Sequence, residues 1–108
     1  MINSAANFTS IEFINLCKAH KVKELYAFGS VVNGNFTEQS DIDLLVEIDE
    51  HDPLNKGQLL LSLWNKLEVY FNRKVDLLTV SSLRNPYLRD SINNTKKLIY
   101  DGSKEEVL

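Results

Sequence analysis

Two aspartates separated by one residue, Asp41 and Asp43, are the strongest candidates for chemistry in this sequence. They open a mostly apolar stretch, Asp41–Ile48, which predicts a β-strand. Side chains alternate across a strand, so both carboxylates project from one face, with α-carbons about 7 Å apart. Two ionised carboxylates held this close repel each other, and a hard cation such as Mg²⁺ relieves the repulsion. The pair therefore predicts a Mg²⁺ site.

A third carboxylate, Asp76, lies inside another apolar stretch, Lys74–Val80, which also predicts a strand. If this strand pairs beside Asp41–Val46, the sheet spacing of about 4.8 Å brings Asp76 to the same metal ions. We therefore expect Asp76 to complete the site, provided that the two strands are neighbours.

The dipeptide Gly29-Ser30 follows a predicted strand, Lys23–Phe28. Glycine permits a tight turn and lets a phosphate approach backbone N–H groups that a following helix start leaves unpaired, while the serine adds a hydroxyl donor. A Gly-Ser pair alone is equally typical of an ordinary turn. Its distance from the two aspartates favours the phosphate site.

Gly29-Ser30, ten intervening residues, Asp41, one residue and Asp43 together resemble the signature of the DNA polymerase β-like nucleotidyltransferase superfamily. The match continues through Ser40–Val46. Within that superfamily the chain is similar to the minimal nucleotidyltransferases over most of its length, roughly from residue 23 to residue 100.

The resemblance implies a role for each of these residues. Gly29 and Ser30 would bind the triphosphate of a nucleoside triphosphate, expected to be ATP. Asp41 and Asp43 would bridge two Mg²⁺ ions, and Asp76 would complete the metal site and assist deprotonation of an acceptor hydroxyl. Two metals can stabilise both the attacking oxygen and the leaving diphosphate in an in-line displacement.

One departure from the family pattern concerns phosphate binding. Many relatives carry a basic residue shortly after the Gly-Ser pair, whereas Val31–Gly34 contains none. A basic residue from elsewhere in the chain is a possible replacement, and the candidates are Lys56, Arg73, Lys74, Arg84 and Arg89.

The remaining elements indicate an α/β (α+β) chain with one small mixed sheet of about four strands and helices packed on it, a nucleotidyltransferase fold in one domain over residues 1–108. A possible capping box of Thr9 with Glu12 starts a first helix, and Asp52-Pro53 is a typical N-cap and first position of a second. Strand order is left open. The predicted helices run from Thr9 to about His20, from Asp52 to about Phe71 and onward from Pro86, and Leu98–Tyr100 is the fourth predicted strand.

Composition narrows the class of protein. With 108 residues, 44% of them apolar, the chain can bury one hydrophobic core. A net charge of −3 without a polybasic block argues against a nucleic-acid partner. The sequence shows neither a signal peptide nor an apolar run of about 20 residues, so a cytoplasmic location without membrane contact is expected. Cys17 is the only cysteine, which excludes an intrachain disulfide and a multi-cysteine zinc site.

The resemblance also implies a partner. Several minimal nucleotidyltransferases are antitoxins encoded beside helical HEPN-type toxins, on which they AMPylate a tyrosine. We expect no second, acceptor-binding domain in the 108 residues, and the second helix carries a wider apolar arc than one sheet requires. The arc consists of Leu59, Leu60, Leu61, Leu63, Trp64, Leu67, Tyr70 and Phe71.

Two alternatives remain open at this point. The chain could neutralise its partner by binding alone, which the missing basic residue after Ser30 motivates. It could also modify a small molecule of the aminoglycoside type, with a dimer supplying the missing second domain. Nucleotide preference, acceptor identity and homo- or hetero-oligomeric state are not determined by the sequence.

Overall fold

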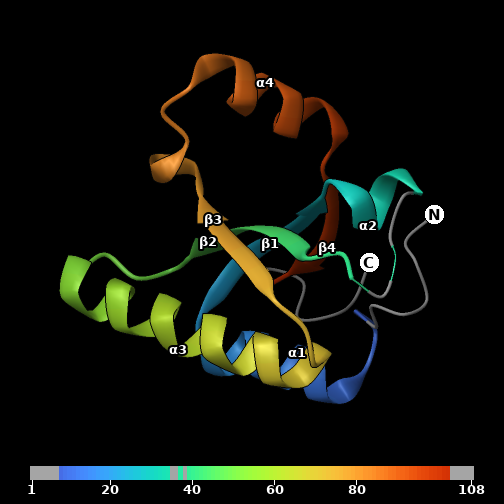
Figure 1. Ribbon diagram of the computed structural model, residues 1–108. Helices are drawn as coiled ribbons and strands as arrows, with labels where there is room; N and C mark the ends of the chain where they lie inside the picture. Colours follow the sequence, from blue (N-terminus) through green and yellow to red (C-terminus); the bar gives the residue numbers. More distant parts are fainter. Residues whose placement is uncertain (1–7, 35–36, 38, 103–108) are drawn as a thin grey trace.

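The chain folds around one four-stranded mixed sheet in the computed structural model, which describes residues 8–34, 37 and 39–102 (Figure 1). Along the chain the elements are α1 (Ile11–Ala19), β1 (Val22–Phe28), α2 (Ser30–Asn33), β2 (Ile42–Ile48), α3 (Pro53–Phe71), β3 (Val75–Thr79), the 3₁₀ turn η1 (Val80–Ser82), α4 (Pro86–Thr95) and β4 (Lys97–Asp101).

The strand order in the sheet is β3-β2-β1-β4. β1 runs antiparallel to β2 and to β4, whereas β2 and β3 are parallel. A parallel pair needs a long crossover connection, and α3 provides it. The predicted mixed sheet of about four strands is confirmed, and the strand order that the sequence left open places the acid-bearing strands β2 and β3 side by side.

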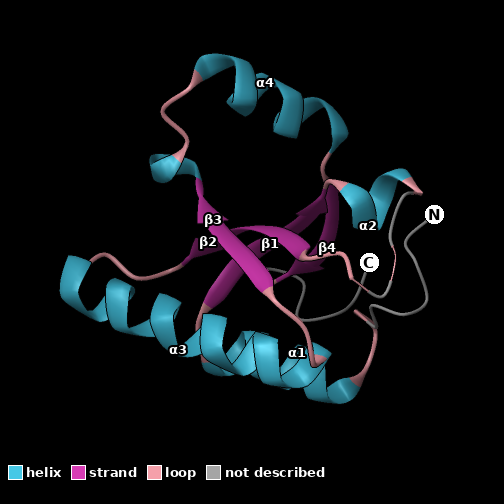
Figure 2. Cartoon of the chain, in the orientation of Figure 1, coloured by secondary structure: helices cyan, strands magenta, loops and turns pink. Residues whose placement is uncertain are grey.

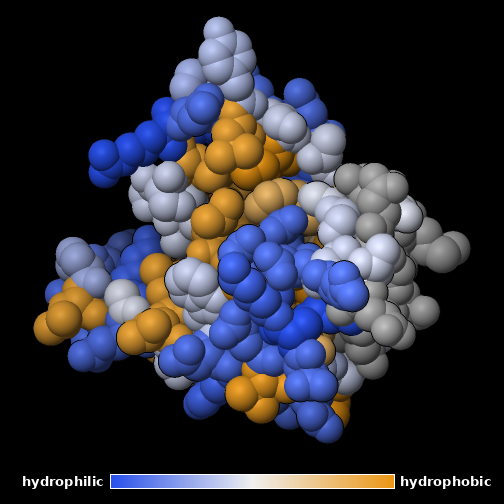
Figure 3. Space-filling view, in the orientation of Figure 1, coloured by the Kyte–Doolittle hydropathy of each residue, from blue (hydrophilic) through white to orange (hydrophobic). Residues whose placement is uncertain are grey.

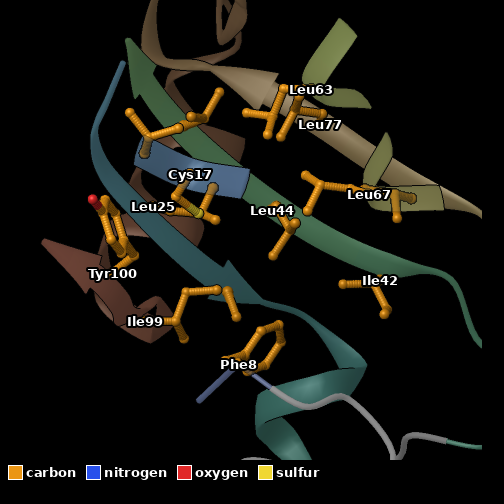
Figure 4. Packing of buried hydrophobic residues seen from close by; sticks show 14 of the residues in the cluster. Phe8, Cys17, Leu25, Ile42, Leu44, Leu63, Leu67, Leu77, Ile99 and Tyr100 are labelled. Atoms are coloured by element: carbon orange, nitrogen blue, oxygen red, sulfur yellow. The ribbon is translucent and has the colours of Figure 1, made fainter. Parts of the chain in front are cut away.

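The helices lie on both faces of this sheet (Figure 2). α1 and α3 cover one face, and the main hydrophobic core lies between them and the alternate residues of the strands (Figure 4). β2 contributes Ile42, Leu44, Val46 and Ile48 to that core. α4 covers part of the opposite face, where a smaller cluster is formed by Leu45, Leu83, Ile92, Tyr26, Phe28 and Leu78.

The start of α3 follows the predicted chemistry. The Asp52 side chain accepts a hydrogen bond from the backbone N–H of Asn55 at 3.1 Å, and Pro53 occupies the first turn. The helix ends at Phe71, after which Asn72 takes a left-handed conformation with φ 53°. Both predicted ends of this helix are therefore confirmed.

The predicted cap of α1 was wrong by one residue. Ser10, not Thr9, is the N-cap, and its hydroxyl accepts from the backbone N–H of Phe13 at 3.1 Å. The same hydroxyl is hydrogen-bonded to the Tyr70 hydroxyl of α3. This contact across the two helices favours the serine, and it could not be read from local sequence.

His20 lies where α1 ends and is buried. One ring nitrogen, Nδ1, lies 2.8 Å from the Leu16 carbonyl oxygen, and Nε2 lies 2.9 Å from the Ser62 hydroxyl of α3. The first contact binds a carbonyl oxygen in the last turn of α1, whereas the second joins α1 to α3. Both ring nitrogens of His20 therefore take part in hydrogen bonds that stabilise the fold.

The apolar arc of α3 serves mainly the core. Leu63 and Leu67 are fully buried, and four further members of the arc pack against the core: Leu59, Leu60, Tyr70 and Phe71. Leu61 and Trp64 are 61% and 38% exposed, so part of the apolar arc remains on the surface, as predicted. None of the helices in the described part of the chain is long and apolar enough to cross a membrane.

Replacing the α3 cap tests how far local capping stabilises the fold. We expect Asp52→Ala to lower the free energy of unfolding by about 1 kcal/mol, because the Asn55 N–H loses its acceptor. Asn65→Ala, an exposed position within the same helix, should change it by less than about 0.5 kcal/mol. Urea unfolding followed by circular dichroism measures both, and equal effects would contradict the assignment of the cap.

Candidate active site

Asp43 and Asp76 are direct neighbours across the parallel strands β2 and β3. They pair in register, which places their α-carbons about 4.8 Å apart, the usual spacing between strands. The structure therefore meets the condition on which the sequence analysis made the role of Asp76 depend, that its strand lies beside the strand of Asp43. Both side chains are half-buried on the face of the sheet opposite to Ile42 and Leu44.

The environment of Asp43 disfavours its charged form. The pKa of this carboxyl is raised to about 6, mostly by burial and then, in decreasing order, by the negative charge of Asp76, a hydrogen bond with Asp76 and the charge of Asp41. Asp41 precedes the first residue of β2 and is half-buried. All three aspartates therefore act on one another electrostatically, with Asp43 at the centre.

Gly29 lies against the Asp43 carboxylate. It follows the last residue of β1, Phe28, which pairs with Asp43 across the two strands. A Cβ at position 29 would lie 2.4 Å from the Asp43 Oδ2 atom, and the backbone φ of 72° is one that side chains rarely adopt. Only glycine fits here, and Ser30 begins α2 immediately beside the acid group.

The short helix α2 was not predicted as such, because one turn is too short to show helical periodicity. It begins at Ser30, directly after Gly29, and runs to Asn33, and Gly34 after it takes a left-handed conformation with φ 89°. The predicted arrangement of a Gly-Ser pair followed by a helix start is thus present in the structure.

The chemistry of the donors suits a hard divalent cation, since carboxylate oxygens are its preferred ligands. Within residues 8–34, 37 and 39–102, however, no three His, Cys, Asp or Glu side chains already converge in the geometry that a metal ion requires. Asp43 and Asp76 form the close pair, and Asp41 influences it by charge only.

Arg73 supports the segment that leads into Asp41. Its Nη1 atom donates to the carbonyl oxygens of Thr37 and Ser40, each at 3.0 Å. The guanidinium that was a candidate for phosphate binding therefore holds backbone carbonyls. Another candidate, Arg89, donates from Nη2 to the Leu83 carbonyl at 2.5 Å.

Comparison with known proteins agrees with this geometry. The sequence profile of the family described as "Nucleotidyltransferase domain" matches residues 12–99. The chain belongs to this family of nucleotidyltransferases.

The chain is similar to particular members of the family. It is 43% identical over 81 residues to MJ1379, a candidate protein adenylyltransferase of Methanocaldococcus jannaschii, and the match covers 75% of this chain and 78% of that protein. It is 36% identical over 87 residues to the protein adenylyltransferase MntA of Thermococcus cleftensis, covering 73% and 85%. A solved Shewanella oneidensis complex of a tri-AMPylated HEPN toxin with an MNT antitoxin shares the fold, with a TM-score of 0.57, 22% identity and coverage of 87% and 71%.

Titration of the acid pair tests its electrostatics. We expect a pKa of about 6 for Asp43 in the cation-free protein, and a lower value in Asp76→Asn that still exceeds the ordinary value because burial remains. A raised native pKa means that the folded state binds the proton more tightly than the unfolded chain. The contribution of Asp43 to stability should therefore fall as pH rises from about 4 to 6. Carboxyl-carbon NMR measures the pKa, and an ordinary value in the wild type would contradict the pairing.

The contact between Gly29 and Asp43 is tested by two matched glycine substitutions. Gly29→Ala and Gly34→Ala both place a side chain at positive φ, but only the former meets another atom. We expect Gly34→Ala to cost about 1 kcal/mol from backbone strain, and Gly29→Ala to cost clearly more because Asp43 must move. Urea unfolding measures both, and equal losses would show that the Asp43 side chain lies elsewhere.

Proposed function

We propose that this nucleotidyltransferase is a protein adenylyltransferase antitoxin, which transfers AMP from ATP to a tyrosine of a HEPN-type toxin. The observation that carries the proposal is the in-register pairing of Asp43 with Asp76, with Gly29 against the Asp43 carboxylate. The adenylyltransferases of the two archaea support the reaction, and the Shewanella oneidensis complex supports the acceptor.

The chain's own residues take the following roles in this proposal. Gly29 and Ser30 bind the triphosphate where β1 gives way to α2. The tyrosine Oη attacks the α-phosphorus, the bond from that phosphorus to the bridging oxygen breaks, and diphosphate leaves. The proton of the tyrosine hydroxyl passes to the Asp76 carboxylate.

Asp41, Asp43 and Asp76 are the residues that would hold Mg²⁺, two ions by family resemblance. When bound, these ions stabilise negative charge on the attacking and leaving oxygens. The raised pKa of Asp43, due first to burial and then to the charge of Asp76, supports the assignment, because a cation would compensate both. No covalent intermediate between enzyme and nucleotide is needed.

Exposed apolar residues on two helices form a surface that a partner protein could contact. Leu54, Leu61 and Val69 are exposed on α3, and Tyr87 and Leu88 are exposed on α4. Figure 3 shows apolar surface beneath α4 that borders hydrophilic surface on the same face of the molecule. We infer a hetero-oligomer with the toxin, and a cytoplasmic location remains a prediction from sequence.

The decisive experiment incubates the protein with its genomic neighbour, Mg²⁺ and ATP, and follows both proteins by intact mass. We expect the neighbour to gain one or more AMP units, and an Asp41→Asn, Asp43→Asn double variant to abolish the gain while the complex still forms. Peptide mapping should place AMP on tyrosine. Asn65→Ala serves as the control, because Asn65 is an exposed residue of α3 with no proposed part in the reaction, and this variant should transfer AMP normally.

Other outcomes would replace the proposal. A stable complex without any mass gain, combined with full neutralisation of the toxin by the double variant, would show a protein that acts by occlusion. Transfer of AMP to an aminoglycoside but not to the neighbour would show a small-molecule enzyme.

A further inference from the structure

β3 carries Asp76 and lies at the edge of the sheet. It has five residues, its one partner among the described strands is β2, and Asp76 is its second residue. The end of an edge strand has hydrogen-bond partners on one side only, so it opens more readily than the sheet interior. A carboxylate in this place keeps its alignment with Asp43 only if something else holds the strand.

Two side chains of α3 hold the residue immediately before Asp76. Trp64 donates from Nε1 to the Val75 carbonyl oxygen at 2.6 Å, and the Glu68 Oε2 atom accepts from the Val75 backbone N–H at 3.0 Å. Trp64 and Glu68 are four residues apart and so lie on one face of the helix. Together they bind both polar backbone groups of one residue, an arrangement that we call the Val75 clip.

The Val75 clip acts on the outer edge of β3. The Lys74 carbonyl accepts from the Ile42 N–H at 3.0 Å, which directs this part of the strand toward β2. Backbone groups alternate in direction along a strand, so those of Val75 point away from β2. There they meet α3, which also forms the connection between the two acid-bearing strands.

We propose that Trp64 and Glu68 are positioning residues for AMP transfer, because the Val75 clip keeps Asp76 in register with Asp43. The inference rests on the proposed function of the site. Glu68 contributes a carboxylate acceptor, and hydrogen bonds to charged groups are the stronger ones. Trp64 keeps 38% of its surface exposed while its N–H is bound, so its value to the protein lies in that bond as well as in packing.

Three substitutions separate the clip from general packing. Trp64→Phe keeps an aromatic ring and removes the donor, Glu68→Leu removes the acceptor, and Glu68→Gln keeps an acceptor oxygen. Ile48→Val serves as the control, since it trims a buried side chain at the opposite end of β2 without touching the clip.

We expect Trp64→Phe and Glu68→Leu to lower kcat about 10- to 100-fold, the usual consequence of misplacing a catalytic group by about an ångström. KM for ATP should stay within about twofold, because Gly29 and Ser30 lie on β1 and α2. Glu68→Gln should restore most of kcat. A fall in kcat for Ile48→Val equal to that of the clip variants would overturn the proposal, as would unchanged kcat in the clip variants.

Two measurements on the isolated protein keep this test separate from the proposed function. Hydrogen exchange followed by NMR should show the Val75 and Asp76 amides exchanging at least about tenfold faster in Glu68→Leu, while the Leu44 amide is unchanged. Mn²⁺, used as a probe of the acid site, should bind more weakly in the clip variants than in Ile48→Val. If the wild type transfers no AMP, the proposed function fails. If hydrogen exchange or Mn²⁺ affinity is unchanged in the clip variants, the positioning role fails, whatever the result for AMP transfer.

Discussion

Repulsion between Asp43 and Asp76 is the constraint on which the site depends. Asp43 is half-buried and lies in register with Asp76 on the adjacent strand, and burial followed by the negative charge of Asp76 raises the pKa of Asp43 to about 6. Such a pair pushes its strands apart when both members are charged. The surrounding structure has to hold β2 and β3 together against that force, and several of its features do so.

The forces that oppose this repulsion come from both sides of the pair. α3 crosses from β2 to β3, and its Trp64 and Glu68 side chains fix Val75 from the outer edge. Arg73, just beyond the end of α3, binds two carbonyls of the segment that enters Asp41. On the other side, the absence of a side chain at Gly29 gives the Asp43 carboxylate the space it occupies. The three aspartates are thus positioned through hydrogen bonds to the backbone of neighbouring residues and through the space that Gly29 leaves.

The features predicted from sequence are those that repeat or that belong to a single short motif. Short apolar runs placed the strands, and Asp52-Pro53 gave the start of α3. The contact between Asp43 and Asp76 could be predicted only conditionally. Each aspartate lies in a separate apolar stretch, and the two can meet only if the two strands are neighbours in the sheet. The structure supplied that condition through the strand order.

The features missed from sequence are contacts between segments that carry no repeating pattern. Trp64 was grouped with the apolar arc, since nothing in its spacing reveals that its N–H reaches Val75. Arg73 was one of five candidates for a phosphate contact because of its charge, whereas its position after the left-handed Asn72 turns it toward the loop before Asp41.

The energetics of Asp43 also bear on the choice between catalysis and occlusion. A protein that only covers its partner gains nothing from a half-buried Asp43 carboxyl whose ionised form is disfavoured beside Asp76. Polar groups held against their local preference are typical of functional sites, where a ligand supplies the missing compensation. The cost built into Asp43 therefore favours catalysis over occlusion.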